Sequence, residues 1–120
     1  MKCKILIVDD DSRNIFALHA VLKAKGYGCA STTSAKDALA LLEKDRSFDV
    51  VLMDMMMPEM DGYQAIKAMH AHPQLASIPV IAVTAQAMDG DREKCLEAGA
   101  AGYLSKPINV DDLVSVLEKY

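Results

Sequence analysis

Residues 50–62 read VVLMDMMMPEMDG, and this stretch decides the fold. Its first four residues are apolar and two of them are β-branched, which is typical of a short buried strand. The run ends on the carboxylate of Asp54, and Pro58 and the Asp61-Gly62 pair then predict a loop. Open α/β sheets bind their ligands at the carboxyl ends of their strands. Asp54 is therefore predicted to lie where chemistry takes place.

The alternation of an apolar run with an amphipathic segment continues on both sides of this stretch. Further strands are expected at residues 4–8, around 29–31, at 80–83 and at 103–105. Helices are expected behind the candidate N-caps Ser12, Ser34, Asp89 and Asn109, and between the Asp61-Gly62 loop and His72. The helix after Asp89 is expected to reach about Ala98 with a thin apolar stripe, because Leu96 is its only large aliphatic residue.

Five strands alternating with five helices predict an α/β fold in which helices cover both faces of a parallel sheet. Right-handed crossover connections leave few possible topologies. Among them we expect a doubly wound (βα)5 sandwich, with a five-stranded parallel sheet in the flavodoxin-like order 2-1-3-4-5. With 120 residues, the chain is expected to form one domain over residues 1–120.

The composition argues against several classes of protein. A net charge of −4 is unlike the clustered basic surface of nucleic-acid-binding proteins, so no direct nucleic acid binding is expected. The three cysteines have no CxxC spacing, which predicts neither a disulfide framework nor a zinc site and fits a reducing cytosol. No run approaches the roughly 20 apolar residues that span a bilayer. We expect a cytoplasmic protein that does not bind membranes.

Acidic residues follow two strands that are neighbours in this order. Asp9 and Asp10 come after the first strand and Asp54 ends the third, so the topology brings the three carboxylates together. Such groups repel by about 4 kcal/mol per pair at about 4 Å and an effective dielectric constant of about 20. Mg²⁺ offsets such repulsion, since it prefers oxygen ligands and keeps positions for water and phosphate. A magnesium site is therefore predicted here.

Two further polar residues mark the ends of the fourth and fifth strands. Lys106 comes after the fifth strand and is expected to reach the acidic site from the opposite side, while Thr84 ends the fourth strand. A carboxylate between a divalent cation and an ammonium group has the chemistry of a phosphoryl acceptor, because both cations neutralise the equatorial oxygens of an in-line transition state. The Thr84 hydroxyl is a donor for the phosphoryl group once it has arrived.

Each of these residues also has an ordinary structural interpretation. Acidic runs at strand ends are often solvated loop charges or helix caps, a Lys-Pro pair is often a loop, and a strand-terminal Thr is often a capping group. The methionines around residues 55–60 fit soft packing better than soft-metal binding, because acids surround them. The coincidence of Asp, Asp, Thr and Lys at four strand ends favours one common site.

Four motifs stand in a familiar order and spacing: LIVDD at 6–10, LMDMMMPEMDG at 52–62, VTA at 83–85 and KP at 106–107. Over essentially its whole length the chain resembles the receiver domain of two-component response regulators, such as chemotaxis regulators. In the sequence at 14–18 and 85–88 it resembles receivers of hybrid kinases. By this resemblance Asp54 is the phosphorylated residue. The resemblance also implies Mg²⁺ bound directly by Asp10, Asp54 and the backbone carbonyl of Met56, Asp9 acting mainly through water, and Thr84 and Lys106 contacting the phosphoryl group.

The resemblance further implies how the signal enters and leaves. The phosphoryl donor is a histidine kinase or a His-containing phosphotransfer protein, and the output is an unidentified downstream protein. In the switch the Thr84 hydroxyl moves toward the phosphoryl group and Tyr103 turns inward, although Tyr103 also fits simple packing against the last helix. The expected partner surface is the helix after Asp89, the fifth strand and the last helix. Lys106-Pro107 is expected to be cis.

Two other classes of protein share parts of this pattern. An aspartate-nucleophile phosphatase is expected to carry a second acid two residues after the nucleophile, where this chain has Met56. A flavodoxin-like cofactor binder needs a Gly, Ser and Thr loop after the first strand, where this chain has three acids. We expect a signalling domain, and an enzyme only toward its own phosphorylation and dephosphorylation. By the resemblance, Met56 and Gln86 occupy the two positions that tune the lifetime of the phosphoryl group. Neither side chain is an acid or a base that activates water, so we expect no fast intrinsic hydrolysis of the phosphorylated aspartate.

Overall fold

Five parallel strands form one sheet in the order β2-β1-β3-β4-β5 in the computed structural model, which describes residues 3–85 and 90–120. The strands are β1 (Lys4–Val8), β2 (Gly28–Thr32), β3 (Val50–Asp54), β4 (Val80–Thr84) and β5 (Gly102–Ser105). The helices are α1 (Ser12–Ala24), α2 (Ala35–Lys44), α3 (Gly62–Ala71), α4 (Asp91–Glu97) and α5 (Val110–Leu117). The predicted fold class and strand order are confirmed.

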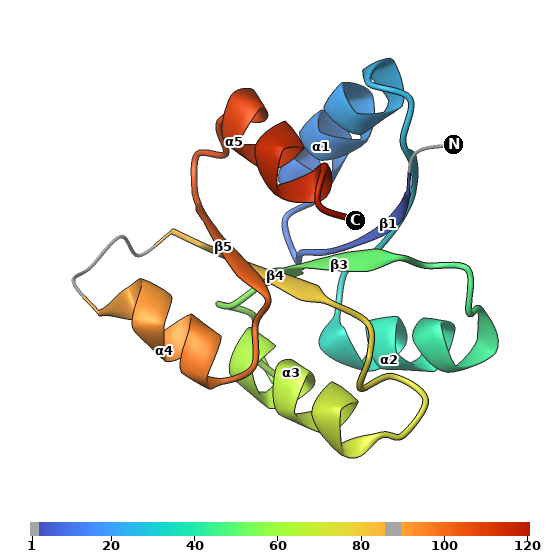
Figure 1. The fold of residues 1–120 in the computed structure, drawn as a ribbon, viewed down its shortest axis with the longest axis vertical. Coiled ribbons are helices and arrows are strands. Elements are labelled where there is room, and N and C mark those ends of the chain that lie inside the picture. Colours follow the sequence, from blue (N-terminus) through green and yellow to red (C-terminus); the bar gives the residue numbers. More distant parts are fainter. Residues whose placement is uncertain (1–2, 86–89) are drawn as a thin grey trace.

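The helices form a layer on each face of the sheet (Figure 1), with α1 and α5 on one side and α2, α3 and α4 on the other. Alternate residues of each central strand point to opposite layers, so Ile5 and Ile7 pack with α1 and α5 whereas Leu6 and Val8 pack with α2 and α3. Every residue of β3 and β4 is buried, as expected for strands covered on both faces.

Side-chain caps begin most of the helices. Ser34 accepts a hydrogen bond from the amide of Asp37, and Asn109 accepts from the amides of Asp111 and Asp112, as predicted. The cap of α1 is Asp11 and not Ser12, because the Asp11 carboxylate accepts from the amide of Arg13 at 3.0 Å and thereby makes Ser12 the first helical residue.

The helix α4 is shorter than expected. It begins at Asp91 behind Gly90, which has a φ of 85° and makes no side-chain cap, and the predicted cap Asp89 lies outside the described residues. Its buried residue is Cys95, whereas Leu96 is 39% exposed. The apolar contact of α4 is therefore thin, as predicted, but its main residue is different.

Two more features bear on the earlier expectations. The Lys106-Pro107 peptide bond is cis, as the resemblance implied. In the described part of the chain, none of the helices combines the length and the apolar character that crossing a membrane requires.

Candidate functional site

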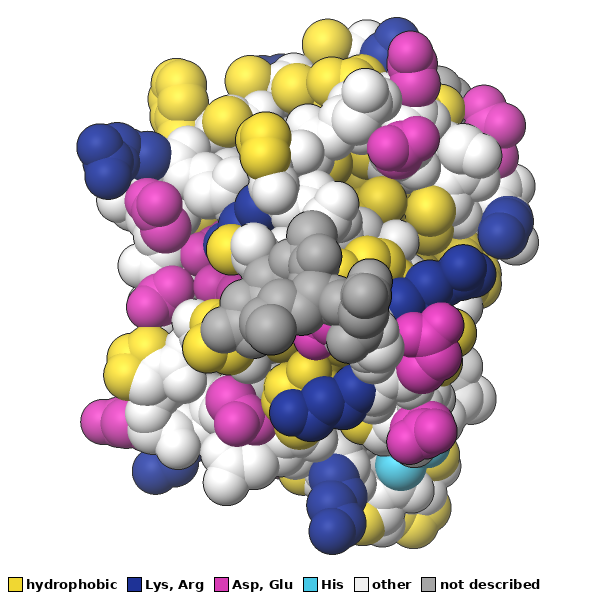
Figure 2. Space-filling model, turned by 90° about the vertical axis from the view of Figure 1, so that its left-hand side faces the viewer, with side chains coloured by type: hydrophobic (Ala, Val, Ile, Leu, Met, Phe, Trp, Pro, Cys, Tyr) yellow, Lys and Arg dark blue, Asp and Glu magenta, His cyan; other side chains and the backbone are white. Residues whose placement is uncertain are grey.

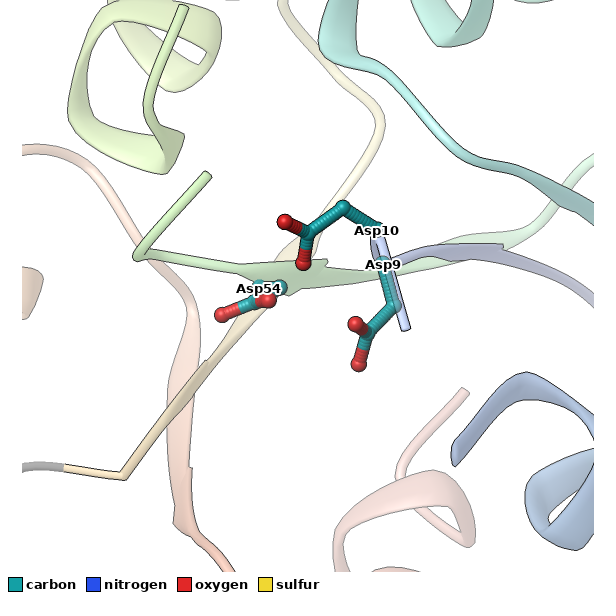
Figure 3. Close-up of side chains that lie close together, drawn as sticks. All are labelled: Asp9, Asp10 and Asp54. Carbon is teal, nitrogen blue, oxygen red and sulfur yellow. The ribbon is translucent and has the colours of Figure 1, made fainter. Parts of the chain in front are cut away.

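The three predicted carboxylates lie together at the carboxyl ends of β1 and β3. Val8 pairs with Met53 in the sheet, so the next residues, Asp9 and Asp54, lie side by side at the ends of neighbouring strands. One carboxylate oxygen from each of Asp9, Asp10 and Asp54 lies within 4.8 Å of the others. In Figure 3 the Asp10 side chain turns toward Asp54, whereas the Asp9 side chain points downward from the end of β1. Figure 2 shows this end of the molecule, where acidic side chains gather beside a basic one.

Asp54 is one of the two buried acids of this cluster. It is 4% exposed, its Oδ1 accepts a hydrogen bond from the Met56 amide at 3.1 Å, and its Oδ2 lies 3.4 Å from Lys106 Nζ. Burial raises the pKa of the Asp54 carboxyl, and the charge of Asp9 adds to this, against the Met56 amide and Lys106, which lower it. The ionised Asp54 is therefore held in an environment that disfavours its charge.

Asp9 is 2% exposed, and both of its oxygens already have donors. Oδ1 accepts a hydrogen bond from the Asp11 amide at 2.9 Å. Oδ2 accepts a hydrogen bond from Asn14 Nδ2 at 2.5 Å and forms an ion pair with Lys106 Nζ at 3.2 Å. Sequence reasoning missed Asn14. Its position in the first turn of α1, five residues after Asp9, was the available signal, since that turn begins directly behind β1.

Lys106 is the cation that the structure places among these acids. Its ammonium group contacts Asp9 and Asp54, and its backbone amide donates to the Thr84 carbonyl at 2.7 Å, which ties the end of β5 to the end of β4. Burial lowers the pKa of Lys106, but the charges of Asp54 and Asp9 outweigh this effect and raise it. Lys106 therefore stays protonated beside Asp54.

The turn after Asp54 is shaped by a close approach of the backbone. A Cβ on Gly62 would lie 2.7 Å from Met55 Cα and 2.9 Å from the Asp54 carbonyl oxygen, so only glycine fits there. This contact packs the start of α3 against the end of β3. Met55 and Met57 are buried in the core, while Met56 is 54% exposed. Met55 and Met57 therefore act in packing, as expected, whereas Met56 is open to solvent.

A comparison with models of protein families identifies the family of this chain. The response regulator receiver domain model matches residues 5–118 of the chain. The chain belongs to the response regulator receiver domain family. The predicted resemblance is thereby confirmed, and the phosphatase and flavin-binding alternatives lose their support.

Proteins similar to this chain include response regulators and the receiver domain of a sensor kinase. The polar-differentiation response regulator DivK of Brucella anthropi is 36% identical and covers 100% of this chain and 97% of its own length. The crystal structure of the receiver domain of the sensor histidine kinase PA1611 from Pseudomonas aeruginosa has a TM-score of 0.89 and 35% identity, and the match covers 100% of this chain and 98% of that one. That structure is described with a magnesium ion coordinated in its active-site cleft. CheY4 of Vibrio cholerae gives a TM-score of 0.86 and 31% identity, covering 99% and 98% of the two chains.

The donor set of this receiver fits a hard divalent cation. Among the described residues, the cluster offers carboxylate oxygens and no thiol or imidazole ligand. Three carboxylates face one ammonium group, which leaves uncompensated negative charge at the strand ends. Mg²⁺ takes oxygen ligands and tolerates few protein ligands, because water and phosphate complete its shell.

Thr84 and Tyr103 occupy different places relative to the acids. Thr84 is 2% exposed and pairs with Ser105 at the end of β4, beside the strand that carries Asp54. Tyr103 is half-buried on β5, and its hydroxyl donates to Asp91 Oδ2 at 3.1 Å. Tyr63 donates to Asp91 Oδ1 at 3.4 Å, so Asp91 joins α4 to both α3 and β5. Sequence reasoning missed Asp91, because no local pattern marks an acid that accepts from two distant tyrosines.

Proposed function

We propose that this receiver takes a phosphoryl group from a phosphohistidine on a histidine kinase or a His-containing phosphotransfer protein onto Asp54. The observation that supports this most is the burial of Asp54 between an acidic cluster and Lys106. An Asp54 carboxylate oxygen attacks phosphorus, the phosphorus–nitrogen bond of the donor breaks, and the imidazole nitrogen keeps the electron pair. Lys106 neutralises charge on the phosphoryl oxygens during this in-line transfer.

Magnesium belongs to the same proposal. Asp10 and Asp54 would hold the ion directly, together with the Met56 backbone carbonyl. Asp9 would act through water, which agrees with the three donors that already engage its oxygens. When bound, the ion supplies positive charge that offsets both the carboxylates and the incoming phosphoryl group. The site then catalyses only its own phosphorylation and dephosphorylation.

The output is proposed to be a change in the face made by α4, β5 and α5. The Thr84 hydroxyl would donate to the phosphoryl group, and Tyr103 would turn inward behind it. The hydrogen bonds of Tyr103 and Tyr63 to Asp91 support this proposal, because they link the rotamer of Tyr103 to the position of α4. A downstream protein would bind this face, and the net charge of −4 argues against direct nucleic acid binding.

Fast intrinsic hydrolysis of the phosphoryl group is not expected under this proposal. Met56 offers neither an acid nor a base that activates water. The second tuning position, Gln86, lies outside the described residues.

Phosphoramidate tests this proposal, because it is a small donor with a phosphorus–nitrogen bond. Intact mass spectrometry of the whole chain is expected to show a gain of about 80 Da that requires Mg²⁺. Asp54→Asn should abolish the gain. Asp11→Asn is the matched control, since Asp11 lies outside the cluster and Asn keeps the helix cap. A gain in Asp54→Asn as large as in the wild type would refute the assignment.

A further inference from the structure

A second candidate site lies between α1 and β2, apart from the acidic cluster. It is a groove of about 480 Å³. Its lining residues are Phe16, His19, Ala20, Lys23, Tyr27, Gly28 and Cys29. Cys29 pairs with Ile5 near the start of β1, whereas Asp9 follows the end of that strand. The groove is therefore toward the opposite end of the sheet, and the proposed phosphoryl transfer does not use it.

A thiol and an imidazole meet in this groove. Cys29 Sγ on β2 lies 3.0 Å from His19 Nδ1 on α1. The other two cysteines are enclosed in the core, with Cys3 9% exposed and Cys95 0% exposed. Cys29 is half-buried and lines the groove, so it is the cysteine that a small molecule can reach without unfolding the protein.

The walls of the groove define the kind of molecule that fits. Lys23 follows His19 by one helical turn, and none of the seven lining residues is acidic. Phe16 precedes His19 by three residues and is 77% exposed, which provides an apolar wall. A ligand with negative charge and a soft, electrophilic sulfur matches these groups.

We propose that Cys29 is a thiol modification site that forms a mixed disulfide with small anionic disulfides of the glutathione class, with His19 as the base. The Cys29 sulfur attacks one sulfur of the disulfide while its proton passes to His19 Nδ1. The disulfide bond breaks, the departing sulfur keeps the electron pair, and His19 returns the proton to it. The products are one mixed disulfide at Cys29 and one free thiol.

The role of His19 follows from the environment of the thiol. Burial raises the pKa of Cys29, so at rest the proton stays on sulfur, and the thiol donates to His19 Nδ1 when the imidazole proton is on Nε2. Attack then requires a base within hydrogen-bond reach, and His19 is placed at that distance. Lys23 contributes by attracting the negative charge of the disulfide.

Glutathione disulfide added to the reduced, full-length protein at neutral pH tests this proposal by intact mass and peptide mapping. We expect one adduct, located on Cys29 and absent from Cys29→Ser. His19→Gln should slow its formation about tenfold or more, because the base is lost. Lys23→Gln should slow it about twofold with glutathione disulfide and leave it unchanged with a neutral disulfide such as hydroxyethyl disulfide.

Matched controls separate reactivity from folding. His70→Gln and Cys3→Ser should react as fast as the wild type, because both residues lie outside the groove. Thermal unfolding of each variant identifies any that has lost the fold. Reaction first at Cys3 or Cys95, or an unchanged rate in a folded His19→Gln, would overturn the proposal. Neither result bears on phosphorylation of Asp54, which is measured separately.

Discussion

Two clusters of lysine and aspartate lie at opposite ends of the same sheet and differ mainly in burial. At the carboxyl end, Lys106 contacts Asp9 and Asp54, whose side chains are 3% and 5% exposed. At the amino end, Lys4 Nζ contacts Asp45 at 3.1 Å and Ser47 Oγ at 2.7 Å, on side chains open to solvent. In the first cluster burial raises the pKa of Asp54, whereas in the second the hydrogen bonds from Ser47 lower the pKa of Asp45 to about 2.

The difference shows what burial does to similar charges. Ser47 supplies two hydrogen bonds to Asp45, which is the main reason why the pKa of Asp45 falls, and water screens the remaining charges. Asp54 lacks that solvation and faces Asp9, so its negative charge is disfavoured in the absence of a further cation. The exposed cluster joins β1 to the α2–β3 loop, whereas the buried one holds two acids away from solvent beside Lys106.

Replacing the two lysines gives the largest expected contrast. Lys106→Met should reduce the rate of phosphorylation by phosphoramidate about 100-fold or more, because the transferred group loses a preorganised cation. In metal-free buffer it should also lower the free energy of unfolding by about 2 to 3 kcal/mol, since two buried acids lose their counter-charge.

Lys4→Met is the matched variant for this measurement. It removes a lysine of the same sheet, yet it should leave the phosphorylation rate unchanged and affect unfolding much less. Equal effects of the two variants on unfolding would mean that burial is not the feature that distinguishes the clusters.

Magnesium should change the stability of the wild type through the buried cluster and not through the exposed one, and this effect should be smaller than that of Lys106→Met. Without metal, Asp54→Asn is expected to be more stable than the wild type by about 1 kcal/mol near pH 7, because one of two buried like charges is removed. Added Mg²⁺ should then raise the melting temperature of the wild type and have little effect on Asp54→Asn. In Asp45→Asn the response to Mg²⁺ should equal that of the wild type, and a reduced response there would place the metal elsewhere.

Stability should depend on pH with opposite signs at the two ends. The pKa of Asp54 is raised in the folded state, so its contribution is present at low pH and is lost as pH rises from the ordinary value through the folded one. The pKa of Asp45 is lowered, so its contribution is present above the ordinary value and is lost as pH falls through about 2. The free energy of unfolding would be measured across the acid range for the metal-free wild type and for Asp54→Asn. The value for the wild type minus the value for Asp54→Asn should fall as pH rises. A difference curve that rises with pH would contradict this account.

The smallest effect is expected at Ser47. Ser47→Ala removes the hydroxyl that hydrogen-bonds to Asp45 Oδ1, so the pKa of Asp45 should move back toward its ordinary value. Carboxyl-carbon NMR titration would measure this directly, and the pKa of Asp54 should not change. A shift at Asp54 would show that the two ends of the sheet are coupled.

The central elements of the site were predictable because strand ends are marked in the sequence. An apolar run that stops on Asp54, on Thr84 or before Lys106 fixes where those residues lie once the strand order is known. Choosing between adjacent caps was harder, since Asp11 and Ser12 both have suitable side chains and the backbone geometry decides. The contact of Asn14 with Asp9 is local and was missed although its position behind β1 was a signal. The contacts of Asp91 with two tyrosines depend on how α4 docks, which no local pattern encodes.

The position of the phosphoryl group among the three clustered acids tests the central claim most directly. The wild type would be phosphorylated with phosphoramidate and Mg²⁺, the acyl phosphate reduced with borohydride, and the modified residue located by peptide mass spectrometry. The account predicts modification of Asp54, because Lys106 and the Met56 amide flank its carboxylate. Modification of Asp9 or Asp10, with Asp54 left unchanged, would contradict it.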